Sequence, residues 1–133
     1  MTEELKNKIL NLIEAKHIEE AIKLCDEAIE KDDKDEDAYF LKGSCNFDLK
    51  NYNTVIENLN KTIELNPNYE KAYFNRGLSK SYLKLYKEAL DDFDMSIKLN
   101  PNIDRTYFEK SIILFDIKKY EEAIINLGAG PDN

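Results

Sequence analysis

Three aspartates near the end of the first quarter of the chain have the spacing of the first ligands in a calcium-binding loop. Asp33, Asp35 and Asp37 alternate with other residues, as the oxygen ligands of such a loop do. A complete loop also needs glycine at its sixth position and glutamate at its twelfth. Counted from Asp33, those positions hold Ala38 and Ser44. We therefore expect no metal site here, and we predict a solvated loop whose acids stand at the start of a helix.

The chain offers few groups for nucleophilic or acid–base catalysis. Its single histidine, His17, falls in a short predicted turn, and Cys25 and Cys45 fall at helical core spacings. This pattern predicts an exposed imidazole and two buried, unreactive thiols. The sequence has no CxxC pair, phosphate-binding loop, dinucleotide fingerprint or GxSxG motif. We expect no enzymatic activity and no cofactor.

Composition places the chain among small acidic globular proteins. It has 133 residues, with 19 Lys and Arg against 27 Asp and Glu, and a formal net charge of −8. That length suits a single domain, 1–133, and the negative charge disfavours binding to nucleic acid or to an anionic membrane surface. The N-terminal residues do not resemble a secretory signal, and no apolar run approaches the ~20 residues that span a bilayer. We expect a cytoplasmic protein.

A repeat of 34 residues organises the whole sequence. When residues 36–69 are aligned with residues 70–103, thirteen of the 34 pairs are identical, and both blocks contain Asn-Pro-Asn near their ends. Composition alone predicts roughly two identities. A third copy follows these blocks and a weaker copy precedes them. The sequence therefore divides into four units, 2–35 (divergent), 36–69, 70–103 and 104–127, followed by a tail, 128–133, that we expect to be disordered.

Each unit has the pattern of two amphipathic helices. In the third unit Tyr73 and Gly77 are spaced for one face of a first helix, and Tyr86 and Phe93 for one face of a second. Two or three residues separate the helices, which forces an antiparallel pair. Because one pair cannot bury both of its faces, the units are expected to stack as a solenoid. The predicted links between paired helices are Lys50-Asn51, Lys84-Leu85 and Lys118-Lys119.

This pattern resembles the tetratricopeptide repeat. The resemblance implies an all-α, right-handed solenoid of antiparallel helix pairs, with about four units and a truncated last one. It also implies a concave groove, lined by the first helix of each unit, in which a partner protein docks. The sequence departs from the family pattern at Ile9, Val55 and Ser111. The third unit carries the motif most clearly, in Ala72-Tyr73-Phe74-Asn75-Arg76-Gly77, Tyr86-Lys87-Glu88-Ala89-Leu90 and Leu99-Asn100-Pro101-Asn102.

The groove positions of the family can be carried onto this chain residue by residue. They give a semi-apolar wall with polar groups beside it, which suits a peptide segment with apolar anchors. One ring per unit (Phe40, Phe74, Phe108) stands in this wall, although an aromatic residue there also packs against the adjoining helix. Our first hypothesis is a non-enzymatic protein–protein interaction module that binds a peptide in this groove. The candidate partner-binding residues are Phe40, Ser44, Phe47, Lys71, Phe74, Asn75, Leu78, Arg105, Phe108 and Ile112.

Some members of the family hold the terminal carboxylates of a chaperone with a clamp of Lys, Asn, Asn, Lys and Arg. In the frame that begins with the second unit, Asn75 and Arg105 match, but Phe40, Ser44 and Glu109 stand at the other three positions. In the frame one unit earlier, only the two lysines match. Since Glu109 would repel a carboxylate, we do not expect a receptor for chaperone tails.

The end of the repeat array suggests a second hypothesis. The last helix is expected to begin at Tyr120 and to stop by about Leu127, before Gly128-Ala129-Gly130-Pro131, so it is shorter than its counterparts. Apolar surface of the fourth unit would then stay partly uncovered and invite a second copy. The alternative function is a homo-oligomerising assembly module that uses its terminal helices. A fragment, or a chain with a disordered tail, fits the same features equally well. The uncovered surface is expected around Ile113, Ile117 and Ile124.

Overall fold

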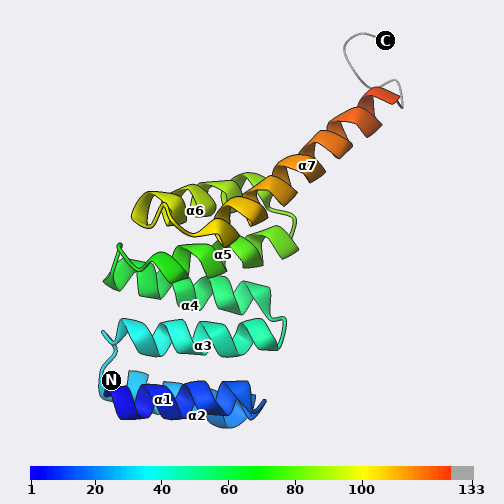
Figure 1. Cartoon of the computed structure of the whole chain (residues 1–133). Coiled ribbons are helices and arrows are strands. Elements are labelled where there is room, and N and C mark those ends of the chain that lie inside the picture. The colour runs from blue at the N-terminus through cyan, green and yellow to red at the C-terminus, as the bar shows by residue number, and fades with distance from the viewer. Residues whose placement is uncertain (127–133) are drawn as a thin grey trace.

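The computed structural model describes residues 1–126, and these residues form seven α-helices and no strand. The helices stack in one row, with α1 and α2 at one end and α7 at the other (Figure 1). The all-α repeat architecture predicted from the 34-residue period is confirmed. The helices are α1 (Glu3–Glu14), α2 (Ile18–Lys31), α3 (Glu36–Asp48), α4 (Tyr52–Leu65), α5 (Glu70–Tyr82), α6 (Tyr86–Leu99) and α7 (Asp104–Asn126).

The first three helix pairs use the same tight turn between their two helices. Lys16, Lys50 and Lys84, which are 34 residues apart, all adopt a positive φ, of 66°, 61° and 62°. The next backbone N–H donates to a carbonyl of the preceding helix, as when Leu85 N donates to the Lys80 oxygen at 2.8 Å. A left-handed residue with such a hydrogen bond ends a helix within a few residues, and the reversal sets the second helix antiparallel to the first.

Small residues let the paired helices approach closely. A Cβ atom added at Gly43 would lie 3.1 Å from the Leu59 side chain, and one added at Gly77 would lie 2.7 Å from the Phe93 ring. Both distances are shorter than an ordinary carbon–carbon contact of about 3.5–4.0 Å. Glycine therefore avoids a clash with the Phe93 ring where α5 meets α6, and at Gly43, where α3 meets α4, a larger residue would need the end of the Leu59 side chain to shift by a few tenths of an ångström. Phe93 is fully buried, in a cluster with Phe74, Leu78, Ala89 and Ile113.

The two cysteines lie in the core of the first two units, as their helical spacing predicts. Cys25 on α2 and Cys45 on α3 are both free and completely buried, in a cluster with Ile9 and Leu41. The hydrogen bond to the Cys45 thiol, together with burial, raises the pKa of Cys25 above its ordinary value. The Cys25 thiol therefore stays protonated at neutral pH, and a protonated thiol is a poor nucleophile.

The fourth unit differs from its prediction. The sequence predicts two helices joined at Lys118-Lys119, the second beginning at Tyr120, but α7 continues through these residues as one helix of 23 residues. Its C-terminal half extends past the ends of α5 and α6 (Figure 1). No glycine or proline interrupts α7, but the closed turns at Lys16, Lys50 and Lys84 also lack both residues. The difference lies in packing, because each earlier second helix is covered by the next helix of the stack, and within residues 1–126 no helix follows α7.

The uncovered surface predicted for this unit is therefore only partly correct. Ile113 is buried against α5 and α6, Ile117 is half-buried, and Ile124 is exposed. Ile113 is covered because the first half of α7 packs on α5 and α6 as the first helix of the next unit should. The predicted helix end at Leu127 and the predicted disordered tail 128–133 lie outside the described residues.

Candidate functional site

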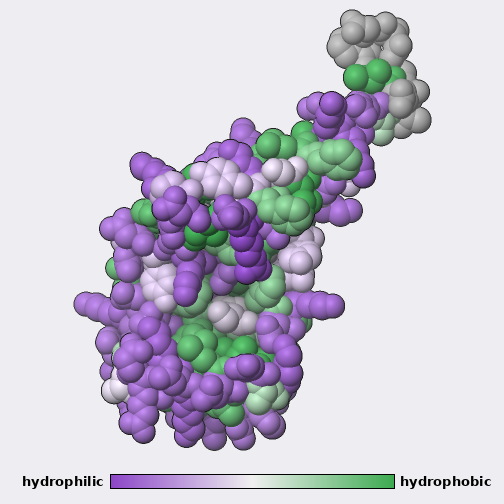
Figure 2. All heavy atoms as spheres, in the orientation of Figure 1, coloured by the Kyte–Doolittle hydropathy of each residue, from purple (hydrophilic) through white to green (hydrophobic). Residues whose placement is uncertain are grey.

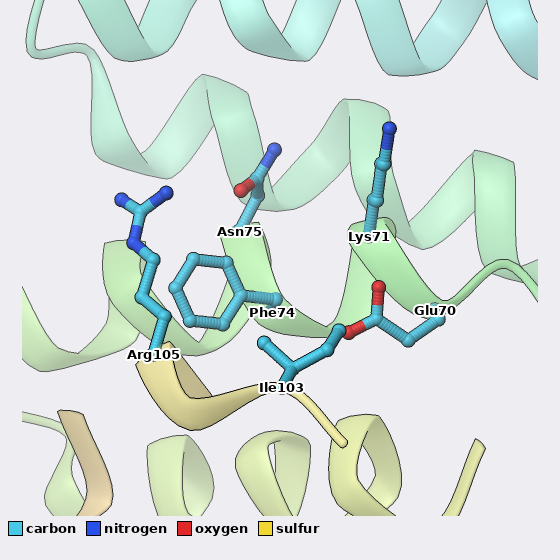
Figure 3. Close-up of a pocket in the computed structure, with 6 residues that line it drawn as sticks. All are labelled: Glu70, Lys71, Phe74, Asn75, Ile103 and Arg105. Carbon is cyan, nitrogen blue, oxygen red and sulfur yellow. The ribbon is translucent and has the colours of Figure 1, made fainter. Parts of the chain in front are cut away.

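A pocket of about 220 Å³ lies between the first half of α5 and the start of α7. The Lys71, Asn75 and Arg105 side chains reach toward the same side, and the Phe74 ring lies among them (Figure 3). These four residues were predicted from the groove positions of the repeat, and the structure brings them together in one pocket. The full lining is Glu70, Lys71, Phe74, Asn75, Ile103 and Arg105.

The positions of these residues along the helices explain why they converge. Lys71, Phe74 and Asn75 are spaced by three and four residues on α5, so their side chains share one helical face. Arg105 lies in the first turn of α7, 34 residues after Lys71. It therefore has the same register in its unit as Lys71 has in the preceding one, and the stacking of α7 on α5 brings both cations to the lining of the same pocket.

The pocket has an apolar floor, and its rim carries the cations Lys71 and Arg105 together with the carboxylate of Glu70. The guanidinium carbon of Arg105 lies 4.7 Å from the centroid of the Phe74 ring, which is a cation–π distance. Ile103 adds an aliphatic surface near the ring (Figure 3). Within residues 1–126, no carboxylate forms an ion pair with Lys71 or Arg105. The arrangement can hold an anionic group beside an apolar one.

Two lining residues, Glu70 and Ile103, were not among the predicted ones. Ile103 is the residue directly before α7, and it stands 34 residues after Tyr69. The Tyr69 ring packs on Phe40, with the two ring centroids 4.9 Å apart. The repeat thus contained a signal for Ile103, because Tyr69 covers the corresponding ring of the previous unit. Glu70 accepts a hydrogen bond from the Ser96 hydroxyl at 2.7 Å, and the repeat contained a signal for it too, because Glu36 stands at the same position of the second unit.

Three predicted residues on α3 lie outside this pocket. Phe40 is half-buried, and the Ser44 hydroxyl donates to the Phe40 carbonyl at 3.2 Å, within its own helix. The Phe47 ring has its centroid 5.6 Å from that of Tyr52 and 6.0 Å from that of Tyr82. The aromatic contacts of Phe47 join α3 to α4 and α5, so this residue has a packing role whether or not a partner binds.

The other predicted residues differ widely in exposure. Leu78 is buried beside Phe93, and only 7% of Phe74 is exposed, whereas Phe108 is 63% exposed and Ile112 is also exposed. Figure 2 shows hydrophobic side chains along α7 and a second hydrophobic area in the lower half of the view, on a surface that is mostly hydrophilic. The three rings of the predicted row therefore differ in exposure. A ring is covered by the first helix of the following unit, and no described helix follows α7, which carries Phe108.

Side chains that bind metal ions do not converge in the part of the chain that the structure describes. In residues 1–126, no three His, Cys, Asp or Glu side chains are grouped to hold a metal ion. Asp35 instead caps α3, where its Oδ1 accepts from Ala38 N at 3.2 Å. His17 is exposed at the start of α2. No helix within the described range is long and apolar enough to cross a membrane.

Comparison with known sequences relates the chain to a family of repeat proteins. The family model described as "Anaphase-promoting complex, cyclosome, subunit 3" matches residues 14–96, which include α2 to α5 and most of α6. None of the curated protein sequences matches the chain significantly.

Solved structures of TPR domains match most of the chain. The first TPR of Spaghetti (RPAP3), bound to HSP90 peptide SRMEEVD, has a TM-score of 0.82 and 25% identity, over 86% of this chain and 90% of that one. The first TPR domain of the human RPAP3 protein has a TM-score of 0.83 and 25% identity, over 89% and 93%. The Arabidopsis OM64 TPR domain, at 22% identity and a TM-score of 0.79, covers 84% and 92% and shows the fold alone.

Proposed function

The chain belongs to the tetratricopeptide-repeat family described as anaphase-promoting complex, cyclosome, subunit 3, and on that premise we propose that it is a non-enzymatic protein–protein interaction module. Its concave groove, formed by the first helices of successive units, binds a peptide segment of a partner protein. The pocket between α5 and α7 is the part of the groove that selects the chemistry of that segment.

The observation that carries this proposal is that apolar and cationic side chains line the same pocket. Phe74 and Ile103 offer an apolar surface, and Lys71, Asn75 and Arg105 offer hydrogen-bond donors, two of them charged. An extended segment with a carboxylate next to an apolar side chain meets both surfaces at once. The first TPR of Spaghetti (RPAP3), 25% identical to this chain, was solved with a bound peptide, which supports the same mode of binding here.

The charge of the whole chain supports a protein partner. A net charge of −8 repels nucleic acid and anionic lipid, so the local cations of the groove are best suited to an acidic side chain or a terminal carboxylate in a polypeptide. We place the protein in the cytoplasm as part of this proposal, since its buried, protonated Cys25 suits a reducing compartment.

Arg105→Ala is expected to weaken peptide binding by about tenfold or more, since a hydrogen bond to a charged group contributes about 1.5–3 kcal/mol. Arg105 is exposed, so the substitution leaves the fold intact. The probe is a fluorescein-labelled peptide enriched on the wild-type chain from a displayed library of short random peptides, and the readout is its dissociation constant by fluorescence anisotropy.

Lys87→Ala is the matched control for this experiment. Lys87 is an exposed cation near the start of α6 and does not line the pocket, so its removal changes the net charge equally and should leave the dissociation constant within about twofold of the wild-type value. The proposal fails if the library yields no binder, or if Arg105→Ala and Lys87→Ala weaken binding to the same extent.

The peptide SRMEEVD is a second, defined probe. Glu109 lies one turn after Arg105 on α7 and carries a negative charge where a carboxylate clamp has Arg. Glu109→Arg is therefore expected to raise the affinity for SRMEEVD by about tenfold, or ~1.4 kcal/mol, measured by titration calorimetry. Glu57→Arg, at an exposed position of α4, makes the same charge reversal away from the groove. Equal affinities of the two variants would mean that the peptide does not lie beside residue 109.

A further inference from the structure

Most of the exposed apolar side chains in residues 1–126 lie on the last helix. Of the twelve large apolar residues that are exposed in this range, eight belong to α7, and Figure 2 shows several hydrophobic side chains along it. Single exposed apolar residues are ordinary on a folded protein, whereas a contiguous group marks an interaction surface. The eight residues are Tyr107, Phe108, Ile112, Leu114, Phe115, Tyr120, Ile124 and Ile125.

These side chains point to two sides of α7. A helix turns by about 100° per residue, so Thr106 and Ile113, which are buried against α6 and α5, mark its inner side. Tyr120 and Ile124 fall on the same inner side, and the Tyr120 ring has its centroid 6.3 Å from that of Tyr86 on α6. The inner side is therefore turned toward the chain's own body along the whole helix.

The opposite side of residues 104–118 forms a second, continuous face, which we call the outer face. Its residues fall within an arc of about 120°, and all of them are exposed. Among the described helices, α7 packs on α5 and α6 alone, and both lie on its inner side. The outer face consists of Asp104, Tyr107, Phe108, Ser111, Leu114, Phe115 and Lys118.

The two ends of the outer face carry opposite charges. Asp104 stands seven residues before Ser111 and Lys118 stands seven residues after it, about 10 Å to either side along the helix axis. Within residues 1–126, neither Asp104 nor Lys118 forms an ion pair. A face of this kind is complementary to itself, because a two-fold axis through its centre sets the acid of each copy opposite the base of the other.

The centre of the outer face suits a close approach. Ser111 is the smallest residue of the face, and its hydroxyl already donates to the Tyr107 carbonyl at 2.9 Å, within its own helix. Covering Ser111 therefore leaves no hydroxyl proton without an acceptor. The apolar residues stand before and after Ser111 along the face, so they meet in pairs when the face is laid antiparallel on a copy of itself.

We propose that the outer face of α7 is the interface of a homodimer, in which two copies lie antiparallel around a two-fold axis that passes beside Ser111. The same face of both copies makes the contact, so the assembly closes as a dimer. The apolar residues before Ser111 on one copy pack against those after it on the other. None of the residues that line the peptide pocket belongs to this face, and the proposal does not rest on the proposed function.

The body of each copy does not obstruct this contact. α7 stands at one end of the row of helices (Figure 1), with α5 and α6 on its inner side. The two bodies therefore lie on opposite sides of the paired α7 helices. Tyr120 keeps its contact with Tyr86 of its own chain and takes no part in the interface.

The size of the apolar surface predicts a weak dimer. Five large apolar residues on the outer face or at its edge are 41–63% exposed, and they offer about 400–600 Å² in each copy, since a side chain of this size carries about 150–250 Å². Two copies bury at most about 800–1,200 Å² of apolar surface, which is at the low end for specific interfaces. We therefore expect a reversible dimer with a micromolar dissociation constant. The five residues are Tyr107, Phe108, Ile112, Leu114 and Phe115.

The variant Ser111→Cys tests the position of the axis. Packed helices have axes about 8–10 Å apart and Cα atoms about 2.3 Å from each axis, so two facing residues at the crossing point come within disulfide range. Oxidation of this variant is expected to give a disulfide-linked product at twice the 15.5 kDa mass of the chain. Mass spectrometry of the digested product should identify a cross-link between residue 111 of the two copies.

Glu122→Cys is the matched control on the same helix. Glu122 is exposed on the same side of α7, eleven residues after Ser111, and the two-fold axis sets its two copies about 33 Å apart along the helices. This variant should not cross-link under the same conditions, and neither should the wild-type chain, whose Cys25 and Cys45 are buried. Equal cross-linking of Ser111→Cys and Glu122→Cys would overturn the proposal, because random collision would then explain both.

Charge reversal tests the pairing without a new cysteine. Asp104→Lys and Lys118→Asp each turn two attractive pairs into two repulsive ones, so each variant alone should dimerise about tenfold or more weakly than the wild type, as measured by light scattering. An equimolar mixture of the two variants restores both attractive pairs and should recover most of the wild-type affinity. A loss that came from a weaker α7 helix would persist in the mixture.

Three results would contradict the homodimer. The first is a mixture that dimerises as weakly as its components, and the second is a wild-type mass that stays at 15.5 kDa at every concentration. The third is a monomeric Ser111→Cys variant whose new thiol is protected from an alkylating reagent, which would mean that residues after Asn126 of the same chain cover the outer face.

Discussion

Phe93→Ala is expected to lower the free energy of unfolding by about 3–5 kcal/mol, the largest effect of any single truncation considered for this chain. Phe93 is fully buried, its ring fills the space above Gly77, and its centroid lies 5.8 Å from that of Phe74. Ala89 and Ile113 complete the same cluster, so the cavity would open between α5, α6 and α7 together. Urea unfolding followed by circular dichroism at constant pH measures the change.

Phe108→Ala is the matched control, because it removes the same ring from a position that is 63% exposed. Its expected effect on the free energy of unfolding is within about 0.5 kcal/mol of zero. If both variants were destabilised equally, the cluster around Phe93 would not be the core of the third unit, and the register of α6 against α5 would have to be revised.

Asp92→Ala is expected to lower the free energy of unfolding by about 2–4 kcal/mol, somewhat less than for a fully buried pair, since its cations are partly exposed. The Asp92 side chain is 5% exposed and accepts from Arg76 Nε at 2.9 Å, from an Arg76 terminal nitrogen at 2.6 Å and from Lys80 Nζ at 2.9 Å. Its removal would leave two cations of α5 without their shared acceptor. The loss of these ion pairs destabilises the fold by more than the removal of one negative charge from a chain of net charge −8 stabilises it.

Asp94→Ala is the control for this substitution on the same helix. Asp94 pairs with Lys110 at 2.7 Å, but the Asp94 side chain is 55% exposed and that of Lys110 is 33% exposed. Ion pairs that are open to solvent contribute about 0–1 kcal/mol. Urea unfolding at two salt concentrations checks both variants, and we expect salt to reduce the effect of Asp94→Ala more than that of Asp92→Ala. An effect of Asp92→Ala below 1 kcal/mol would contradict the importance of this cluster.

The repeat period predicted the fold because local and long-range signals agree in the second and third units. The predicted links at Lys50-Asn51 and Lys84-Leu85 lie between α3 and α4 and between α5 and α6. At each link a tight turn is followed by a second helix whose apolar face fits the glycine of the first helix. The period, the turn and the packing therefore all specify the same antiparallel pair.

The period alone could not predict α7. Lys118 has the same place in its unit as Lys84, and nothing in its immediate sequence forces either a turn or a helix. What closes the earlier turns is packing: the inserted helix is held by its own first helix and by the following unit, as α6 is held by α5 and α7. Within the described residues, no unit follows α7, so the local preference for a continuous helix decides its shape.

Part of the candidate site could also be predicted from the 34-residue register. Lys71, Phe74, Asn75 and Arg105 converge because the 34-residue register fixes which positions of consecutive first helices are neighbours. Exposure could not be predicted from that register. Phe74 is buried beneath Arg105 and beside Phe93, while Phe108 is exposed, although the two residues occupy equivalent positions. Phe74→Ala would therefore disturb the core as well as the groove, and Arg105 is the better residue for a binding test.

The most direct test of groove binding is a chemical-shift map of the ¹⁵N-labelled chain titrated with the library-selected peptide. We expect the largest backbone amide shifts in residues 71–78 of α5 and 103–109 of α7, around the lining of the pocket, and the loss of these shifts in Arg105→Ala. Shifts concentrated on the outer faces of α4 and α6, with residues 71–78 unaffected, would contradict peptide binding in the groove.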